Sequence, residues 1–348
     1  MRFIGNKERL VKWIYAEMKN NNISGNLFFD FFSGTGNVGK YFKEKQYQIV
    51  SSDLMYFSYV LQKAYIENSE YPGFEKLIDK INIKSNKFFT DNYELVIEYL
   101  NNLDGINGFI YQNYTPNDEQ KRMYFIPENG KKIDAIRVKI EEWYTGNLIS
   151  DNEYFILLAC LIESVPFYSN ILGVYAAYKK DWDKRALKPF NLKMIQILKS
   201  QKNHFVYNQN SMELLNKNKY DIIYLDPPYN QRQYAPNYHL LETIAKYDNP
   251  EIKGISGMRD YNNQKSNFCN RDKALSELEK IVCSNNYNYL ILSYNNEGIM
   301  SQDDIMSIFQ KAGNVKLIEY DYLRFKSNSN GLASSKKMIK EQLYLLTN

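Results

Sequence analysis

The first part of the chain alternates between short apolar runs and stretches where apolar side chains recur at helical spacing. Residues 26–32 and 48–52 are apolar runs that predict two buried strands. Residues 33–36 between them form a glycine turn, and a helix is expected to start near Asn37. Residues 7–21 place apolar side chains every three or four positions and predict an amphipathic helix. The order strand, glycine turn, helix and strand opens a Rossmann-like nucleotide-binding unit.

The middle of the chain has no strand pattern. A stretch rich in polar residues, glycine and asparagine is followed by two segments with helical spacing, one through residues 133–143 and one over 151–169. We therefore predict residues 104–201 to be a mainly helical insertion between the third and fourth strands of a sheet. Residues 1–103 and 202–348 are predicted to form the α/β domain that contains this sheet.

Strand patterns return in the last part of the chain. Apolar runs at residues 204–207 and 220–225 predict strands, and a helix is expected over 237–246. The remaining sequence alternates helix, strand, helix, strand and strand, at about 272–284, 287–294, 301–312, 314–325 and 341–347. These elements complete the predicted α/β domain.

Composition excludes several classes of protein. No apolar run approaches the roughly 18 residues needed to span a bilayer, and the N-terminal residues lack the apolar core of a signal peptide. The three cysteines, Cys160, Cys269 and Cys283, show no metal-binding spacing, which predicts a reducing compartment, the cytoplasm. His204 and His239 are far apart in sequence, so we expect no histidine-rich metal site and no zinc deaminase. The net charge of +4 permits nucleic-acid binding but does not argue for it.

The apolar run that ends at Leu225 is followed by Asp226, Pro227, Pro228 and Tyr229. Prolines cannot continue a central strand because they donate no hydrogen bond, so the chain leaves the sheet in a stiff turn. In an open α/β sheet, ligands bind beyond this end of the strands. A carboxylate, a carbonyl and an aromatic ring at this place suit activation of the exocyclic amine of an extruded nucleobase. The alternative is a strand that ends in a proline turn with an incidental tyrosine.

The glycine turn, Ser33-Gly34-Thr35-Gly36, lies between a strand and a helix, where the backbone can approach a ligand closely. Asp53 ends the next strand, where an acid can hydrogen-bond the hydroxyls of a ribose. Each feature alone has an alternative: an ordinary glycine turn for the first and a helix cap for the second. Together, at this separation, they predict a cofactor that contains a nucleoside.

Three of these segments follow one another as in the D12-class adenine-N6 DNA methyltransferases, the family of the Dam enzymes, which this chain resembles. They are Phe29–Val38, Asp53 and Asp226–Tyr229. Residues 2–7 resemble that family's N-terminal motif, an aromatic residue four positions before a lysine. Further segments resemble the branch that accompanies restriction systems, namely Gly173–Tyr178 with Trp182, Lys265–Cys269 and Leu292–Asn295. The resemblance covers most of the chain, in the same order.

The resemblance implies a Rossmann-like class I S-adenosylmethionine-dependent methyltransferase sheet with an inserted target-recognition domain. It implies S-adenosylmethionine as the cofactor, bound by Phe3, Lys7, Asp30, Ser33, Gly34, Gly36, Asp53, Asn210 and Asp226. Lys7 would pair with the methionine carboxylate of the cofactor, and its alternative is an exposed lysine at a helix start. Asn210 would contact the adenine ring of the cofactor, and its alternative is a turn asparagine.

The same resemblance implies that Asp226, Pro227, Pro228 and Tyr229 are the catalytic residues. The Asp226 carboxylate and the Pro227 carbonyl would each accept one hydrogen of adenine N6, which directs the lone pair of the nitrogen at the methyl group. Tyr229 would stack on the extruded base. The methyl group would then pass by direct displacement, so we expect no metal and no covalent intermediate.

The partner implied is double-stranded DNA, contacted by the insertion through Lys121, Arg122, Lys179, Lys180, Lys184 and Arg185. Acidic residues are interleaved with the basic residues of positions 121–142, so the alternative is that this stretch is a solvent-exposed helix face. We expect a sequence-specific adenine methylase of a restriction–modification system, with any cognate nuclease encoded separately. The alternatives are methylation of cytosine N4, methylation of ribosomal RNA, and a DNA-binding module without catalytic activity.

Overall fold

The structure, a computed structural model, describes residues 4–81, 91–323 and 338–347. The chain divides into two compact units. The sheet unit consists of Phe3–Gln62, Ser200–Ala235 and Tyr261–Asn348, and the helical unit contains Lys63–Lys199 and Pro236–Asp260. Among the described residues, no helix is both long and apolar enough to cross a membrane.

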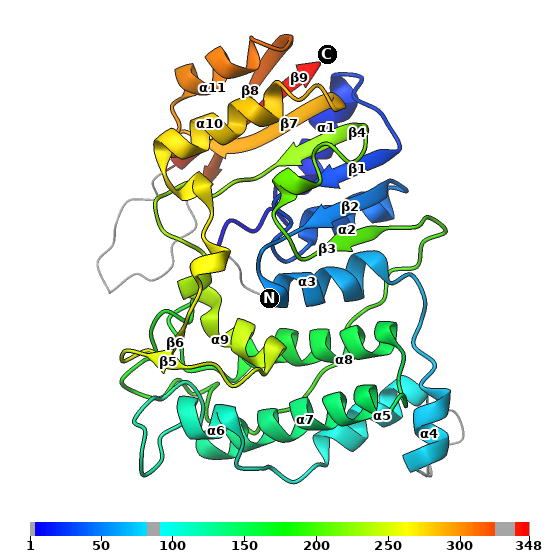
Figure 1. Ribbon diagram of the computed structural model, residues 1–348, viewed down its shortest axis with the longest axis vertical. Coiled ribbons are helices and arrows are strands. Elements are labelled where there is room, and N and C mark those ends of the chain that lie inside the picture. The colour runs from blue at the N-terminus through cyan, green and yellow to red at the C-terminus, as the bar shows by residue number, and fades with distance from the viewer. Residues whose placement is uncertain (1–3, 82–90, 324–337, 348) are drawn as a thin grey trace. The chain divides into compact units, whose positions relative to one another are not determined.

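The sheet unit is built on a mostly parallel sheet, whose strands are labelled in Figure 1. Within the described residues it has seven strands in the order β3-β2-β1-β4-β7-β9-β8. Their bounds are β1 Leu27–Asp30, β2 Gln48–Ser52, β3 Phe205–Tyr207, β4 Tyr220–Leu225, β7 Tyr287–Asn295, β8 Asn314–Leu323 and β9 Met338–Thr347. Strands β3, β2, β1, β4 and β7 run parallel, whereas β9 is antiparallel to both β7 and β8. The prediction of an α/β fold is therefore confirmed.

Helices pack against the sheet because successive strand residues point to opposite faces. Phe28 of β1 stacks on Phe42 of α2, with ring centroids 4.1 Å apart. Its neighbour Phe29 belongs instead to a buried cluster with Leu278 of α10 and Ile308 of α11. The helices of this unit are α1 Val11–Asn20, α2 Asn37–Glu44, α3 Tyr56–Gln62, α10 Arg271–Val282 and α11 Gln302–Phe309, with 3-10 turns η3 Ser211–Glu213, η4 Asn262–Gln264 and η5 Asn267–Cys269.

The helical unit is centred on α7 (Pro127–Thr145) and α8 (Asp151–Ser164), whose buried faces pack together. The apolar positions that predicted the first of these helices are buried: Ile133, Ile136, Ile140 and Trp143. The other elements are the π-helix η1 Lys63–Glu67, α4 Glu75–Ile81, α5 Asn92–Asn101, α6 Phe109–Tyr114, the 3-10 turn η2 Val165–Phe167, α9 Ala235–Lys246, and the short strands β5 Ile252–Lys253 and β6 Met258–Arg259.

Arg137 of α7 explains why α9, far along the chain, belongs to the helical unit. Its side chain is only 3% exposed, and its guanidinium donates to the carbonyls of Ile244 (3.2 Å) and Ala245 (3.1 Å). These carbonyls lie in the last turn of α9, which leaves its final carbonyls without partners inside the helix. A buried arginine therefore caps α9 from the neighbouring helix.

The division into units differs from the predicted one in two respects. The helical unit begins at Lys63 and also takes in Pro236–Asp260, whereas the prediction confined it to residues 104–201. The helical unit begins after the second strand, β2. The described residues between β2 and β3 form no further strand of the sheet, so the predicted place of the insertion, after a third strand, is wrong. The sequence pattern recognised the helices but could not show which of them pack together.

Candidate active site

The carboxyl ends of three parallel strands bring three acids to one edge of the sheet. Asp30 is the last residue of β1, Asp53 follows β2, and Asp226 follows β4. The register pairs Asp30 with Ser51 of β2 and with Tyr224 of β4, so the three strands end side by side. This is the edge at which open α/β sheets bind ligands.

The turn after β4 holds its carboxylate in one orientation. Pro227 and Pro228 are buried, and the Tyr229 hydroxyl donates to Oδ1 of Asp226 at 2.7 Å. Tyr229 also packs edge-on against Tyr294 of β7, with ring centroids 4.9 Å apart. In the described part of the chain, Oδ2 of Asp226 and the carbonyl oxygen of Pro227 have no hydrogen-bond partner. The turn therefore presents two acceptors for a ligand that has two hydrogens to donate.

Lys7 lies beside this turn and is only 4% exposed. Its ammonium donates to the Tyr229 hydroxyl and to Glu341, and lies 3.5 Å from Oδ1 of Asp226. Burial lowers the pKa of Lys7, but the carboxylates of Asp226 and Glu341 outweigh it and the pKa is raised overall. The prediction that Lys7 lines the site matches this position, and the alternative of an exposed lysine is wrong. Its pairing with a cofactor carboxylate stays a prediction.

Burial also changes the acidity of Asp226. It raises the pKa of this carboxyl, the charge of Glu341 adds to the effect, and Lys7 and Tyr229 oppose it, which leaves the pKa at about 6. The Tyr229 hydroxyl keeps its proton, because burial and the Asp226 charge raise its pKa well above the ordinary value. Near neutral pH the turn therefore carries an ionised carboxylate held by a neutral phenol.

Glu341 was not predicted as a site residue. It lies near the start of β9, and because β9 is antiparallel, this end lies beside Asn295 at the carboxyl end of β7. A glutamate at the start of a predicted last strand gives no signal of this in the sequence. Only the order and direction of the strands bring it to the edge where Asp226 lies.

The glycine turn has the backbone geometry that was expected of it. Gly34 and Gly36 have φ of +50° and +73°, a region that residues with a β-carbon rarely adopt. Asp53 accepts from the backbone N–H of Gly34 at 2.9 Å, which closes the glycine turn. It also accepts from the backbone N–H of Met55 at 2.8 Å, just before α3 begins. Ser33 donates from its hydroxyl to the carbonyl of Asp30 at 2.6 Å and accepts from the Ser52 N–H at 3.1 Å. Ser33 thus ties the ends of β1 and β2 together.

Asp30 is buried beneath the turn, at 1% exposure. Its carboxyl accepts from the backbone N–H of Gly39 at 3.2 Å, in the first turns of α2. Burial, followed by the charges of Asp226 and Asp53, raises its pKa to about 8. Asp30 is therefore expected to be a neutral acid at pH 7, unlike Asp226.

Of the remaining predicted cofactor residues, one takes part in a turn and the other lies outside the described part of the chain. Asn210 is exposed, and its side chain accepts from the Met212 N–H at 3.1 Å, which caps the 3-10 turn η3. This is the role of a turn asparagine, and a contact with a cofactor stays a prediction. Phe3 lies outside the described residues.

The candidate DNA-binding residues lie in the helical unit, and only some of them are available to a partner. Lys121, Lys180 and Lys184 are exposed. The Arg122 guanidinium instead donates to the carbonyls of Asn113, Gly254 and Ile255, each at 3.0 Å. Its geometry indicates a structural role, because two of these bonds hold the loop between β5 and β6 and the third reaches α6.

Lys179 and Arg185 are both paired with the same acid. Asp183 lies 2.9 Å from the Lys179 ammonium and 3.3 Å from the Arg185 guanidinium. Both pairs are partly exposed, and ion pairs near a surface typically contribute about 1 kcal/mol or less to stability. The contact of these residues with DNA stays a prediction.

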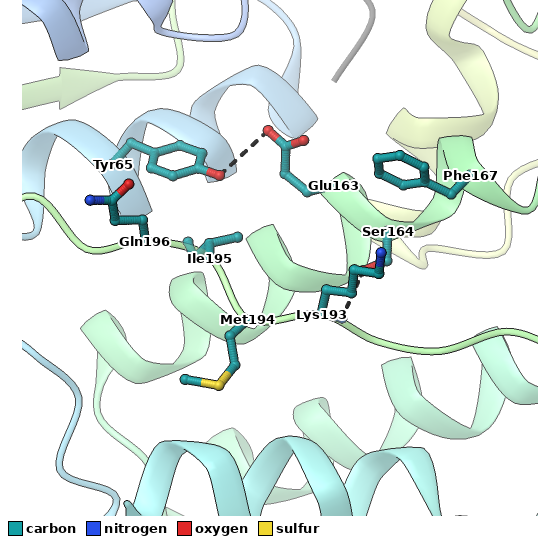
Figure 2. A pocket seen from close by; sticks show the side chains of 8 residues that line it. All are labelled: Tyr65, Glu163, Ser164, Phe167, Lys193, Met194, Ile195 and Gln196. Carbon is teal, nitrogen blue, oxygen red and sulfur yellow. Dashed lines mark hydrogen bonds between the residues drawn. The ribbon is translucent and has the colours of Figure 1, made fainter.

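A cleft of 230 Å³ lies in the helical unit, and Figure 2 shows its lining residues. Tyr65 and Glu163 point toward each other across it, with their oxygens 3.5 Å apart. None of the predicted site residues lines this cleft. Among the described residues, no group of three or more histidines, cysteines or acids is placed to hold a metal ion.

Comparison with known proteins agrees with this geometry. The family model of the D12 class N6 adenine-specific DNA methyltransferases matches residues 3–308. The chain is 41% identical to the Type II methyltransferase M.FokI of Planomicrobium okeanokoites over 96% of the chain and 51% of that protein. It is 39% identical to the modification methylase StsI of Streptococcus sanguinis, over 99% of the chain and 52% of that protein.

The chain thus spans about half the length of these two relatives. Another relative has a similar length to this chain. The Type II methyltransferase M.NlaIII of Neisseria lactamica is 37% identical over 94% of the chain and 93% of that protein.

Proposed function

This chain belongs to the D12 class N6 adenine-specific DNA methyltransferases, and on that premise we propose that it methylates adenine N6 in double-stranded DNA. The methyl donor is S-adenosylmethionine, and the enzyme serves as the protective methylase of a restriction–modification system. The names of its relatives, Type II methyltransferases and modification methylases, support this assignment. The sheet is assigned to the Rossmann-like class I methyltransferase fold, whose cofactor binds at the carboxyl ends of the strands.

The observation that carries the proposal is that the two carboxylate oxygens of Asp226 have different contacts. Oδ1 is held by Tyr229 and faces Lys7, while Oδ2 and the Pro227 carbonyl are open in the described part of the chain. An exocyclic amine has two hydrogens and fits this pair of acceptors. Accepting both hydrogens frees the nitrogen lone pair from the ring and stabilises the positive charge that develops on N6.

The residues at the sheet edge fit a cofactor that carries a sulfonium and a ribose. The glycine turn, with its positive φ values, lets a ligand approach the N-terminus of α2, and Asp53 and Asp226 place negative charge on either side. Bound there, the cofactor supplies the methyl group. The protein orients the amine, excludes water and, through Asp226, accepts a hydrogen of the amine.

Target recognition is assigned to the helical unit. Its exposed cations Lys121, Lys180 and Lys184 have the charge needed for phosphate contacts. The pairs of Lys179 and Arg185 with Asp183 could open when DNA binds. Arg122 is not assigned to base readout, because its donors already hold the loop after β5.

The decisive test is mass spectrometry of nucleosides from unmethylated DNA incubated with the protein and S-adenosylmethionine. We expect N6-methyladenine with the wild type and none with Asp226→Ala, while both proteins keep the same fold, as circular dichroism would show. Glu319→Gln, at an exposed position on β8 of the same sheet, is the control and should methylate like the wild type. If N4-methylcytosine appeared instead, the target base would be cytosine. If ribosomal RNA but not DNA were methylated, the substrate would be RNA. No methylated product from DNA or from RNA would overturn the proposal.

A further inference from the structure

Glu341 is a buried carboxylate to which the proposed mechanism assigns no step. It is 3% exposed and accepts from three donors on three different parts of the sheet unit. These donors are the Lys7 ammonium, the Tyr229 hydroxyl at 3.2 Å and the Ser293 hydroxyl of β7 at 2.9 Å. Burying a carboxylate is costly unless it is paired and hydrogen-bonded, and here every described partner belongs to the active site or to the strand beside it.

The Tyr229 hydroxyl connects the two acids. It has one proton and two carboxylate acceptors, Oδ1 of Asp226 at 2.7 Å and Oε1 of Glu341 at 3.2 Å, and it accepts from Lys7. The shorter distance places the proton on the Asp226 side. Glu341 meanwhile takes the Lys7 ammonium, which otherwise has Asp226 as its remaining carboxylate neighbour.

The positions of the charges show what would follow if Glu341 were neutral. Lys7 would then be attracted to Asp226 alone and would compete with the amine for the Asp226 oxygens. With the Glu341 contact to Lys7 in place, the Lys7 ammonium lies 3.5 Å from Oδ1 of Asp226, and Oδ2 is open among the described residues.

From this arrangement we infer that Glu341 is a positioning residue for methyl transfer, which holds Lys7 and Tyr229 so that one oxygen of Asp226 stays open to the amine. The inference rests on the proposed function and adds to it a residue from the antiparallel strand β9. Glu341 acts through Lys7 and Tyr229 and does not itself contact the reacting atoms.

The variant that tests this role is Glu341→Gln, which keeps the shape and removes the charge. We expect the single-turnover methylation rate to fall about tenfold, the scale of losing one charge-assisted hydrogen bond. Affinity for S-adenosylmethionine should change by less than about threefold, because no group that contacts the cofactor is removed.

The pH dependence of the methylation rate provides a second readout. Its acid limb, where the rate falls as the pH is lowered, would not shift if Glu341 only stabilised the fold. Groups facing Asp226 are Lys7, Tyr229, Asp30, Tyr224 and Glu341, and of these Lys7 and Glu341 bear opposite charges close to it. Removing the negative charge of Glu341 lowers the pKa of Asp226 below about 6. The acid limb of the Glu341→Gln variant should therefore move to lower pH even though its plateau rate is reduced.

Glu319→Gln is the matched control, on the adjacent strand β8 of the same hairpin, where the glutamate pairs with Lys340 at 2.7 Å. It should retain the wild-type rate and profile. Ser293→Ala removes one donor to Glu341 and should lower the rate less than Glu341→Gln, which keeps the test decisive if the glutamine variant fails to fold. If Glu341→Gln and Ser293→Ala both kept the wild-type rate and an unshifted acid limb, this inference would be overturned while the proposed function would stand. A wild-type protein that methylates no DNA would overturn the proposed function and this role with it.

Discussion

Asp30→Asn should make the folded protein more stable as the pH rises, relative to the wild type. The wild-type carboxyl is buried against the Gly39 N–H, with its pKa raised from 3.8 to about 8 by burial and by the charges of Asp226 and Asp53. The unfolded chain loses this proton near pH 4, whereas the folded chain keeps it up to about pH 8. Folded wild-type protein therefore binds one more proton than unfolded protein across this window.

The magnitude follows from linkage between proton binding and folding. One extra proton on the folded state lowers the free energy of unfolding by about 1.4 kcal/mol for each pH unit. The stability that comes from this group is fully present below pH 4 and is lost as the pH rises toward 8. The asparagine side chain has no such proton and can still accept from Gly39, so its curve lacks this slope.

The measurement is urea unfolding of both proteins, without cofactor, at pH 5, 6 and 7. The difference in unfolding free energy, variant minus wild type, should grow by about 2.7 kcal/mol from pH 5 to pH 7. Any change in packing adds a constant that does not vary with pH, so the slope alone tests the titration. Parallel curves with a constant offset would show that Asp30 is ionised in the fold and would refute the reasoning.

Three further predictions concern the turn and the helical unit. Tyr229→Phe should slow single-turnover methylation about tenfold without weakening cofactor binding, because Oδ1 of Asp226 loses its hydroxyl donor; an unchanged rate would contradict this. Wild-type rates should be flat above pH 7 and fall about tenfold per unit well below pH 6, since the ionised Asp226 is the acceptor and its pKa is about 6; a limb near pH 4 would count against it. Arg122→Ala should lower stability by about 2 kcal/mol in thermal unfolding, because three carbonyls lose their donor. Its neighbour variant Lys121→Ala should leave stability unchanged and reduce the salt dependence of DNA binding. The reverse pattern would exclude a structural role for Arg122.

The sequence predicted most of the sheet and the acids at its edge, because both depend on local patterns. Apolar runs that end at Asp53 and Asp226 mark the strand ends, and a glycine turn marks the start of α2. The Asp226–Tyr229 turn could be recognised because prolines cannot lie inside a central strand.

What the sequence could not predict depends on contacts between distant residues. Glu341 reaches the site only because β9 runs antiparallel beside β7, which no local pattern encodes. The three carbonyls that Arg122 contacts, two of them more than 130 positions away in sequence, could not be predicted either, and its contact with DNA stays a prediction. The start of the helical unit at Lys63 likewise depends on which helices share a core.

The capping of α9 by Arg137 has a consequence for any exchange of the helical unit between related proteins. The helical unit is assembled from two stretches of sequence, with β3 and β4 encoded between them. Recombination that exchanged residues 63–199 alone would bring in a foreign α7, and the carbonyls of Ile244 and Ala245 would meet whatever side chain replaced Arg137. A gene exchange that keeps the protein folded must therefore carry both stretches together or preserve this one arginine.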